Sequence, residues 1–215
     1  MKIVSINVGL LRAIKRRGKT ITTSIFKSPV AGRVFVNRLN VVGDQQSDLT
    51  VHGGVDKAVY VYPSEHYAFW RAELPGVDFP WAAFGENFTT AGLLEDTVHI
   101  GDQLRIGSAK FTVTQPRMPC FKLALRFDRP DMVKRFLRSG RSGFYLSVSQ
   151  EGEVAADDAI TLIGHDADPM TVADIFRLYT ADDADPDLLR RASKLPSLAP
   201  GWREHFRERL AEPDA

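Results

Sequence analysis

The feature that most limits the possible folds is a series of short segments in which apolar residues occupy every second position. Such alternation is typical of β-strands that bury one face. Turn residues separate the segments, as at Gly53-Gly54 and Gly101-Asp102. Many short strands divided by turns predict a barrel or sandwich rather than a parallel α/β sheet. The alternating sets are Val4, Ile6 and Val8; Ile21, Thr23 and Ile25; Val34 and Val36; Ala58, Tyr60 and Tyr62; Phe111 and Val113; Phe144, Leu146 and Val148; Ile160 and Leu162.

Two or three helical segments interrupt these strands. The first is expected to begin at Ser64, whose side chain can cap a helix. A second starts near Pro119 and carries Phe121 and Leu125 on its apolar side, and a third follows Pro130. This part of the chain therefore predicts an α+β fold that is mainly β with helices.

The pattern changes at residues 165–169, His-Asp-Ala-Asp-Pro, which are typical of a linker. Beyond them the apolar period becomes helical. Thr171 and Asp174 have the spacing of a capping box, and Asp185-Pro186 is a cap followed by a first-turn proline. We therefore expect a β-rich domain, a barrel or a sandwich, over residues 1–165 and a three-helix C-terminal segment over residues 166–215. The apolar stripes of the three helices include Val172, Ile175, Phe176, Tyr179, Leu188, Ala192, Leu195, Trp202, Phe206 and Leu210.

The composition argues against several classes of protein. The 215 residues carry a net charge of +1, so the chain is not a globally basic nucleic-acid binder. No apolar run approaches the ~20 residues that a membrane span needs, and the N-terminus lacks a signal-peptide pattern. The single cysteine leaves no internal disulfide, which fits a reducing compartment. The default expectation is a cytoplasmic protein that binds neither nucleic acid polymers nor membranes.

The single cysteine, Cys120, lies in an unusual sequence context. Pro116 and Pro119 stiffen the chain before it, and it is expected to open a helix. Arg117 and Lys122 flank it, and nearby cations favour the thiolate form of a cysteine. The alternative is a buried, inert cysteine that behaves as a small hydrophobic residue. The residues alone support the two interpretations about equally.

A reactive thiolate can act as a nucleophile, a redox sensor or a metal ligand. The sequence has no cysteine-protease signature, and a disulfide redox centre would need a second cysteine. It also lacks a dinucleotide-binding Gly-x-Gly-x-x-Gly, a cysteine cluster for iron and sulfur, and the histidine spacing of a zinc site. A soft metal ligand remains. Since one thiolate cannot hold a bare metal ion tightly, Cys120 would complete the shell of a metal that an organic cofactor already chelates.

Residues 51–59 contain paired glycines close to a lysine. Gly53 and Gly54 would let a ligand approach the backbone, and Lys57 would add positive charge toward a phosphate. The alternative is a Gly-Gly hairpin turn with a solvated lysine. His52, taken by itself, is more typical of a hydrogen-bonded structural histidine.

Two further runs contain polar candidates. Glu86 and Asn87 lie between Phe84 and Phe88, where buried polar groups would need partners and could recognise a polar heterocycle. A strand entry with an exposed glutamate is the alternative. Lys27 closes a strand before a proline and could face a pocket, although lysines usually lie at the surface.

Taken in order, these runs resemble the MOSC domain family (molybdenum cofactor sulfurase C-terminal), and specifically its bacterial YiiM-type members. The most specific pieces are residues 52–58, His-Gly-Gly-x-Asp-Lys-Ala, and residues 115–120, Gln-Pro-Arg-x-Pro-Cys. The resemblance covers essentially the whole chain, including the three C-terminal helices. The other runs are 27–30, 43–45, 84–88 and 101–102.

The resemblance implies a barrel-like β fold that binds a molybdenum cofactor, Mo-molybdopterin, with Cys120 as the protein ligand to the metal. It also implies reduction of N-hydroxylated compounds, such as N-hydroxylated purine bases, with electrons from a separate reductase. His52 is the candidate proton donor, because histidine titrates near neutral pH. The cofactor-binding residues would be Lys27, Arg33, Gly53, Gly54 and Lys57 at the phosphate, Glu86 and Asn87 at the pterin edge, and Arg117 and Lys122 beside Cys120.

Two other interpretations remain open at this point. In the first, the protein is a cofactor carrier or a sulfur-handling binding module without turnover. In the second, the barrel binds a small anionic ligand and Cys120 is structural. The sequence is also compatible with a homodimer.

Overall fold

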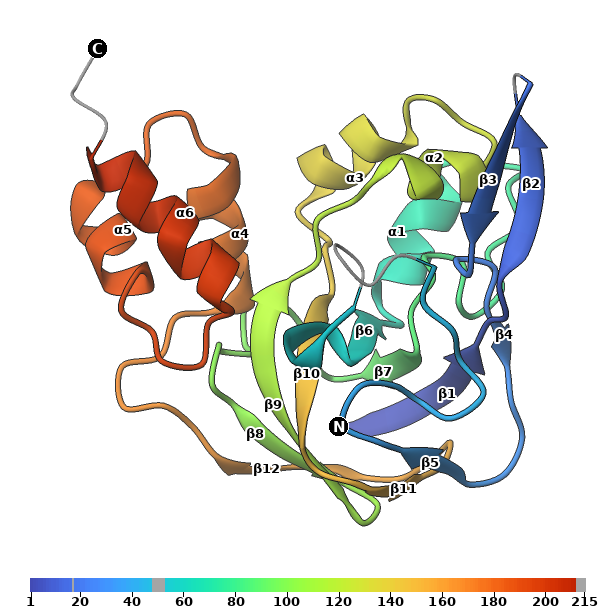
Figure 1. Ribbon diagram of the computed structural model, residues 1–215, viewed down its shortest axis with the longest axis horizontal. Helices are drawn as coiled ribbons and strands as arrows, with labels where there is room; N and C mark the ends of the chain where they lie inside the picture. The colour runs from blue at the N-terminus through green and yellow to red at the C-terminus, as the bar shows by residue number, and fades with distance from the viewer. Residues whose placement is uncertain (17, 48–52, 212–215) are drawn as a thin grey trace.

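The computed structural model describes residues 1–16, 18–47 and 53–211. Within them, the main sheet has eight strands in the order β12-β8-β9-β10-β6-β7-β1-β4 (Figure 1). Neighbouring strands are antiparallel except β6 and β7, which are parallel. The strands are β1 (Lys2–Val8), β4 (Ser28–Pro29), β6 (Val59–Pro63), β7 (Phe88–Ala91), β8 (Gln103–Ile106), β9 (Ala109–Pro116), β10 (Phe144–Gln150) and β12 (Ile160–Gly164).

Two small sheets accompany the main one. β5 (Val34–Val36) pairs with β11 (Gly152–Val154), and β2 (Arg12–Arg16) pairs with β3 (Lys19–Thr23). The β2–β3 hairpin projects at the upper right of Figure 1. The strands predicted from alternation are therefore present, and the main sheet confirms the expected α+β class.

The main sheet is curved rather than fully closed. A single bridge pairs Lys2 of β1 with Ala159, and the Ile160 N–H donates to the carbonyl of Met1 at 3.0 Å. These contacts bring β12, at one end of the strand order, against the start of β1. No closed barrel of paired strands is detected within the described residues, so the expected barrel is an open, curved sheet.

Three helices cover one side of this sheet: α1 (His66–Glu73), α2 (Phe121–Arg126) and α3 (Met132–Ser139) (Figure 1). They enclose a mainly aromatic core in which the Trp70 ring stacks on that of Phe136 with centroids 6.1 Å apart. The short 3₁₀ helix η1 (Val55–Lys57) precedes β6. The loop between β9 and α2 runs along the edge of this core and holds Cys120.

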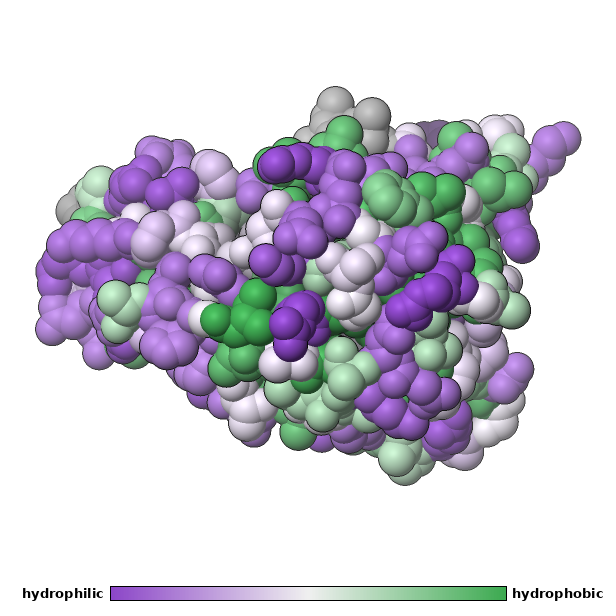
Figure 2. Space-filling view, turned by 90° about the horizontal axis from the view of Figure 1, so that it is seen from below, coloured by the Kyte–Doolittle hydropathy of each residue, from purple (hydrophilic) through white to green (hydrophobic). Residues whose placement is uncertain are grey.

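The C-terminal helices form a separate lobe at the left of Figure 1: α4 (Val172–Thr180), α5 (Pro186–Ala192) and α6 (Pro200–Ala211). The predicted capping box is present, because Thr171 Oγ1 accepts from Asp174 N–H at 3.0 Å and the reciprocal bond is made. Asp185 caps α5 before Pro186, as predicted. The face of the lobe that Figure 2 shows is mostly hydrophilic, and the apolar residues of the lobe join the core of the sheet.

Three local predictions were wrong. A β-bulge between Ile3 and Ser5 shifts the alternation of β1, so Ile3 is buried where Val4 was expected. The first helix begins at His66, and Ser64 makes no cap. Phe121 is 58% exposed, because the buried side of α2 contains Leu123 and Leu125.

Candidate functional site

Cys120 lines a cavity of about 100 Å³ at the junction of β9, α2 and the 24–47 segment. We call it the Cys120 cavity. Its wall contains four cationic side chains and, among the described residues, one carboxylate, that of Asp44. This excess of positive charge favours an anionic ligand. The cations are Lys27, Lys57, Arg117 and Lys122, all predicted as site residues from the sequence.

The Cys120 thiol is partly exposed and is not used to hold the helix. The residue is the N-cap of α2, with φ −120° and ψ 175°, and its side chain makes no capping hydrogen bond. Its carbonyl accepts from Leu123 N–H at 2.9 Å, which fixes the first turn. Pro116 and Pro119 restrict the backbone before Cys120, as predicted, and the residue lies in the cavity wall. Its thiol makes no capping bond to α2.

Arg117 is the most constrained cation of the site. Its guanidinium is buried 5.2 Å from the ring centroid of Tyr60 and 4.9 Å from that of Phe136. Burial lowers the pKa of Arg117, but the electrostatic interactions with Tyr60, Tyr145 and Cys120 raise it by more. The pKa of Arg117 therefore lies above its ordinary value. Nη1 is buried and has no hydrogen-bond partner among the described residues. A buried donor without a partner is costly, so this group is available to an acceptor on a ligand.

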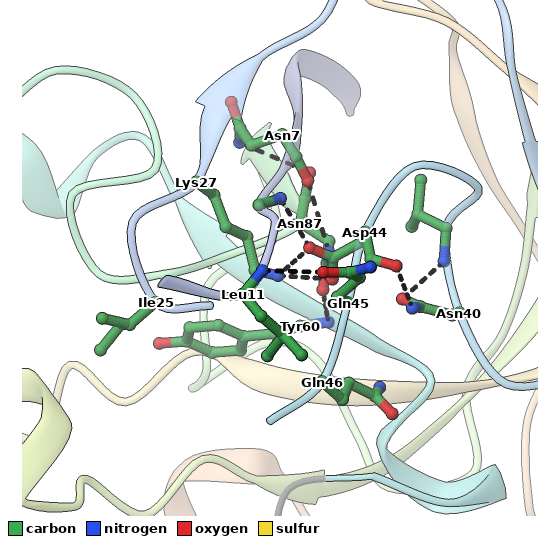
Figure 3. Close-up of polar contacts among 12 residues, drawn as sticks. Asn7, Leu11, Ile25, Lys27, Asn40, Asp44, Gln45, Gln46, Tyr60 and Asn87 are labelled. Atoms are coloured by element: carbon green, nitrogen blue, oxygen red, sulfur yellow. Dashed lines mark hydrogen bonds and ion pairs between the residues drawn. The ribbon is translucent and has the colours of Figure 1, made fainter. Parts of the chain in front are cut away.

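Lys27 lies in a buried polar network with Asp44 and Asn87 (Figure 3). The ammonium contacts both carboxylate oxygens of Asp44, and the side chains are only 8% and 1% exposed. Asp44 also accepts from Gly9 N–H at 2.7 Å and from Asn87 Nδ2 at 2.8 Å. Burial lowers the pKa of Lys27, and Asp44 partly opposes that shift.

The other two lysines approach from different elements. Lys122, on α2, donates from Nζ to Ser47 Oγ at 2.6 Å and so connects the helix to the 44–47 segment. Lys57 ends η1, and its pKa is lowered by burial with Asp56 acting in the opposite direction. Gly54, the N-cap of η1, has φ +95°, a conformation that favours glycine.

A second cavity, of about 560 Å³, adjoins the first on the side of the C-terminal helices. We call it the helix-side cavity. Lys57, Met118 and Tyr145 line both cavities, while Gly53 and Gly54 line only the second. The structure therefore brings most predicted site residues around two adjacent cavities.

Two of the predicted residues lie elsewhere. Arg33 is paired with Asp158 at 3.2 Å in an exposed position and lines neither cavity. Glu86 is fully buried behind the wall, where Ala82 N–H, Phe84 N–H and other protein groups occupy its carboxylate. His52 lies outside the described residues.

Sequence reasoning missed Asp44, Tyr60, Met118 and Tyr145. Asp44 was noted within the 43–45 run of the resemblance and was given no role, although a buried lysine nearby requires a carboxylate. Tyr145 has a usable signal, because it alternates with Phe144 and Leu146, both fully buried, and so points to the other face of β10. Nothing local in the sequence indicates that β6 and β10 place Tyr60 and Tyr145 at the same cavity, since strand pairing decides it.

Comparison with known proteins adds to this geometry. Residues 48–161, more than half of the chain, match the MOSC domain family. The chain belongs to the MOSC domain family. Its residues 170–212, which include α4 to α6, match the YiiM-like 3-alpha helix domain. The resemblance drawn from the ordered motifs is thus confirmed.

Individual MOSC relatives match over most of the chain. YflK of Bacillus subtilis is 39% identical, over 95% of this chain and 92% of its own. The crystal structure of YiiM from Geobacillus stearothermophilus is 37% identical, with a TM-score of 0.82 over 98% of this chain and 99% of that one. A Gibberella moniliformis protein named "Reductase" is 35% identical over 83% of this chain, which spans 32% of that longer protein.

The described residues contain neither a membrane-spanning helix nor a cluster of metal ligands. None of the helices in the described part of the chain combines the length and the apolar character of a membrane span. Across the same residues, no three His, Cys, Asp or Glu side chains gather into a metal site. Cys120 by itself offers a metal one ligand.

Proposed function

We propose that this MOSC-family protein is a molybdenum cofactor-dependent oxidoreductase that reduces N-hydroxylated compounds. The observation that carries the proposal is the juxtaposition of the accessible Cys120 thiol with the unpartnered Nη1 of Arg117, in a cavity rich in lysine. MOSC domains are associated with molybdenum cofactor-related proteins, and one relative is named a reductase. Both facts support the proposal at the level of the family.

The residues at the two cavities fit this cofactor. Thiolate sulfur is a suitable ligand for a soft metal, and Cys120 presents one. Arg117 Nη1 and the nearby lysines supply the donors and the positive charge that a phosphate-bearing ligand requires. When bound, the cofactor supplies a redox-active metal and its two dithiolene sulfurs.

The net reaction takes up two electrons and two protons. The N–O bond of the substrate breaks, the nitrogen is reduced to an amine, and the oxygen leaves as water. A separate donor protein supplies the electrons, because the chain carries no flavin, nicotinamide or iron–sulfur motif. Of the described cations, Lys57 is the candidate proton donor, since it lines both cavities and burial lowers the pKa of its ammonium group.

Replacement of Cys120 tests the proposal. Wild-type protein and the Cys120→Ala and Cys120→Ser variants are made in a molybdenum-sufficient host, and their metal and pterin contents are measured. Turnover of 6-hydroxylaminopurine is then followed with a reduced artificial electron donor. We expect Cys120→Ala to lose turnover or bound molybdenum by at least about tenfold, because the metal loses its protein ligand.

Ser149→Ala, at an exposed position of β10, is the control and should behave as the wild type. Full molybdenum occupancy together with full turnover in Cys120→Ala would overturn the assignment. Metal-loaded wild-type protein that forms no product would instead favour the cofactor carrier or sulfur-handling module.

A further inference from the structure

The helix-side cavity joins the C-terminal lobe to the site around Cys120. Its wall combines the Gly53-Gly54 loop and Gln115 with aromatic residues of α4 and α6. Because Lys57, Met118 and Tyr145 also line the Cys120 cavity, a ligand in the larger space would lie directly beside that site. The proposed chemistry near Cys120 does not account for the aromatic wall.

Three rings from the C-terminal helices form this wall. The Tyr179 ring centroid lies 4.6 Å from that of Trp202 and 4.6 Å from that of His205. Trp202 is 8% exposed and packs into the apolar core, which holds its ring in place, while the Tyr179 ring against it is 36% exposed. An aromatic wall beside a cavity favours a planar aromatic ligand, which it can contact by stacking.

The wall also contains an unused polar group. Nε2 of His205 is buried and has no hydrogen-bond partner among the described residues. An imidazole nitrogen can donate or accept according to its tautomer. A planar ligand with ring nitrogens or an exocyclic amine offers both kinds of partner, which a plain hydrocarbon ring does not.

A glycine keeps space open at this wall. Gly201 is the second residue of α6 and lines the cavity, and a Cβ atom built on it would meet no atom within 4 Å. Its backbone is helical, so its conformation does not require glycine, and glycine is unfavourable inside a helix. A side chain at this exposed position would therefore extend into open space rather than into packed protein.

We propose that the helix-side cavity binds a planar nitrogen heterocycle between the Gly53-Gly54 loop and the wall of Tyr179, Trp202 and His205. We assign this ligand to the base of the N-hydroxylated substrate, an assignment that rests on the proposed function. The pterin ring of the cofactor has the same chemistry and is the other source. In either case the C-terminal lobe contributes directly to the site.

Substitutions that change only the aromatic wall test this assignment. Tyr179→Ala removes a ring, Tyr179→Phe keeps it, and Gly201→Leu fills the space without removing any contact. Leu188→Ala, an exposed position of α5 that lines neither cavity, is the matched control. Binding of 6-hydroxylaminopurine is measured by equilibrium dialysis, pterin content by fluorescence after release, and folding by circular dichroism.

We expect Tyr179→Ala and Gly201→Leu to weaken binding of the purine about tenfold, with Tyr179→Phe and Leu188→Ala close to the wild type. Pterin content should stay unchanged in all four variants. If Tyr179→Ala and Gly201→Leu instead lose pterin, the cavity holds the heterocycle of the cofactor, and the proposed chemistry of the ligand stands.

Unchanged purine binding and unchanged pterin content in folded Tyr179→Ala and Gly201→Leu would overturn the proposal. Wild-type protein that binds no purine and contains no pterin would overturn it as well. A failure of the reductase assignment is distinguishable, because it appears as absent turnover while the purine-binding arm still responds to the wall variants.

Discussion

Glu86 shows how burial changes the role of a residue that the sequence marks only as polar. Its side chain is fully buried, and its carboxylate accepts from Ala82 N–H at 3.0 Å, Phe84 N–H at 3.1 Å and Thr89 Oγ1 at 3.0 Å. Tyr67 also donates to it. These bonds hold the 82–89 turn behind the cavity wall. Burial raises the pKa of Glu86, and the hydrogen bonds only partly oppose that shift.

A pH dependence of stability follows from this raised pKa. The folded protein binds the Glu86 proton more tightly than the unfolded chain does, so the contribution to stability is complete below the ordinary pKa of 4.5 and is lost as pH rises through the folded-state pKa. Glu86→Gln is expected to be destabilising, because the amide NH₂ of glutamine is a donor and would face the N–H and O–H donors that now bond the carboxylate. We expect that destabilisation to shrink as pH rises above 4.5.

Urea unfolding of both proteins at several pH values from 4.5 to 8 measures this difference in the free energy of unfolding. Glu204→Gln, on the exposed surface of α6, should show no comparable trend. A penalty for Glu86→Gln that is constant or grows with pH would contradict the prediction.

Single residues also mark the limit of sequence reasoning at the site. The runs around Lys27, Lys57 and Cys120 could be recognised because each carries unusual local chemistry. The role of Asp44 could not be recognised, since it comes from the buried Lys27 ammonium, which lies 17 residues away in the sequence and which Asp44 neutralises. Glu86 was misjudged for a related reason: the same carboxylate can face a ligand or satisfy backbone N–H groups, and only the fold of the turn decides.

Among the elements, α4 is the one whose start the sequence specifies best. Thr171 and Asp174 are three residues apart and each bonds the backbone N–H of the other. Thr171→Ala leaves the Asp174 N–H without its partner, so we expect a loss of about 1 kcal/mol in the free energy of unfolding. Thr171→Ser keeps the hydroxyl and should restore most of it. Chemical denaturation of the three proteins gives the comparison, and equal stability of Thr171→Ala and wild type would contradict it.

Other elements depend on contacts that local patterns do not encode. Alternation placed β1 correctly but not its faces, because the bulge at Ile3 and Ser5 arises in the pairing with β7. The short α2 could be placed after Pro119, yet its six residues are too few for an apolar period to identify the buried side, and Phe121 was assigned wrongly. β2, β4, β7, β8 and β11 were not predicted. The two-residue strand β4 and the polar strand β7 carry little alternation.

The whole molecule is organised around a core that runs from the sheet into the C-terminal helices. Ile100, Phe111 and Val113 belong to the same apolar cluster as Ile175, Leu198 and Phe206, which come from the other side. Backbone hydrogen bonds join the two parts as well, from Ile100 to Met170, Val172 to Val98, Ala173 to Glu95 and Ala199 to Thr114. Near residue 165 the apolar pattern of the sequence changes from strand-like to helical. The packing of side chains across this point is nevertheless continuous.

This continuity predicts that the lobe and the sheet unfold together. Hydrogen exchange measured by mass spectrometry should give opening free energies for Ile175–Leu178 in α4 and Phe111–Val113 in β9 that agree within about 1 kcal/mol, because neither part keeps its core without the other. The β2–β3 hairpin, which pairs only with itself, should exchange much faster and serves as the internal reference. Exchange of α4 at the rate of that hairpin would mean that the lobe opens independently. The proposed wall of Tyr179, Trp202 and His205 requires that α4 and β9 open with similar free energies. Rings that detach from the sheet cannot hold a ligand against the Gly53-Gly54 loop.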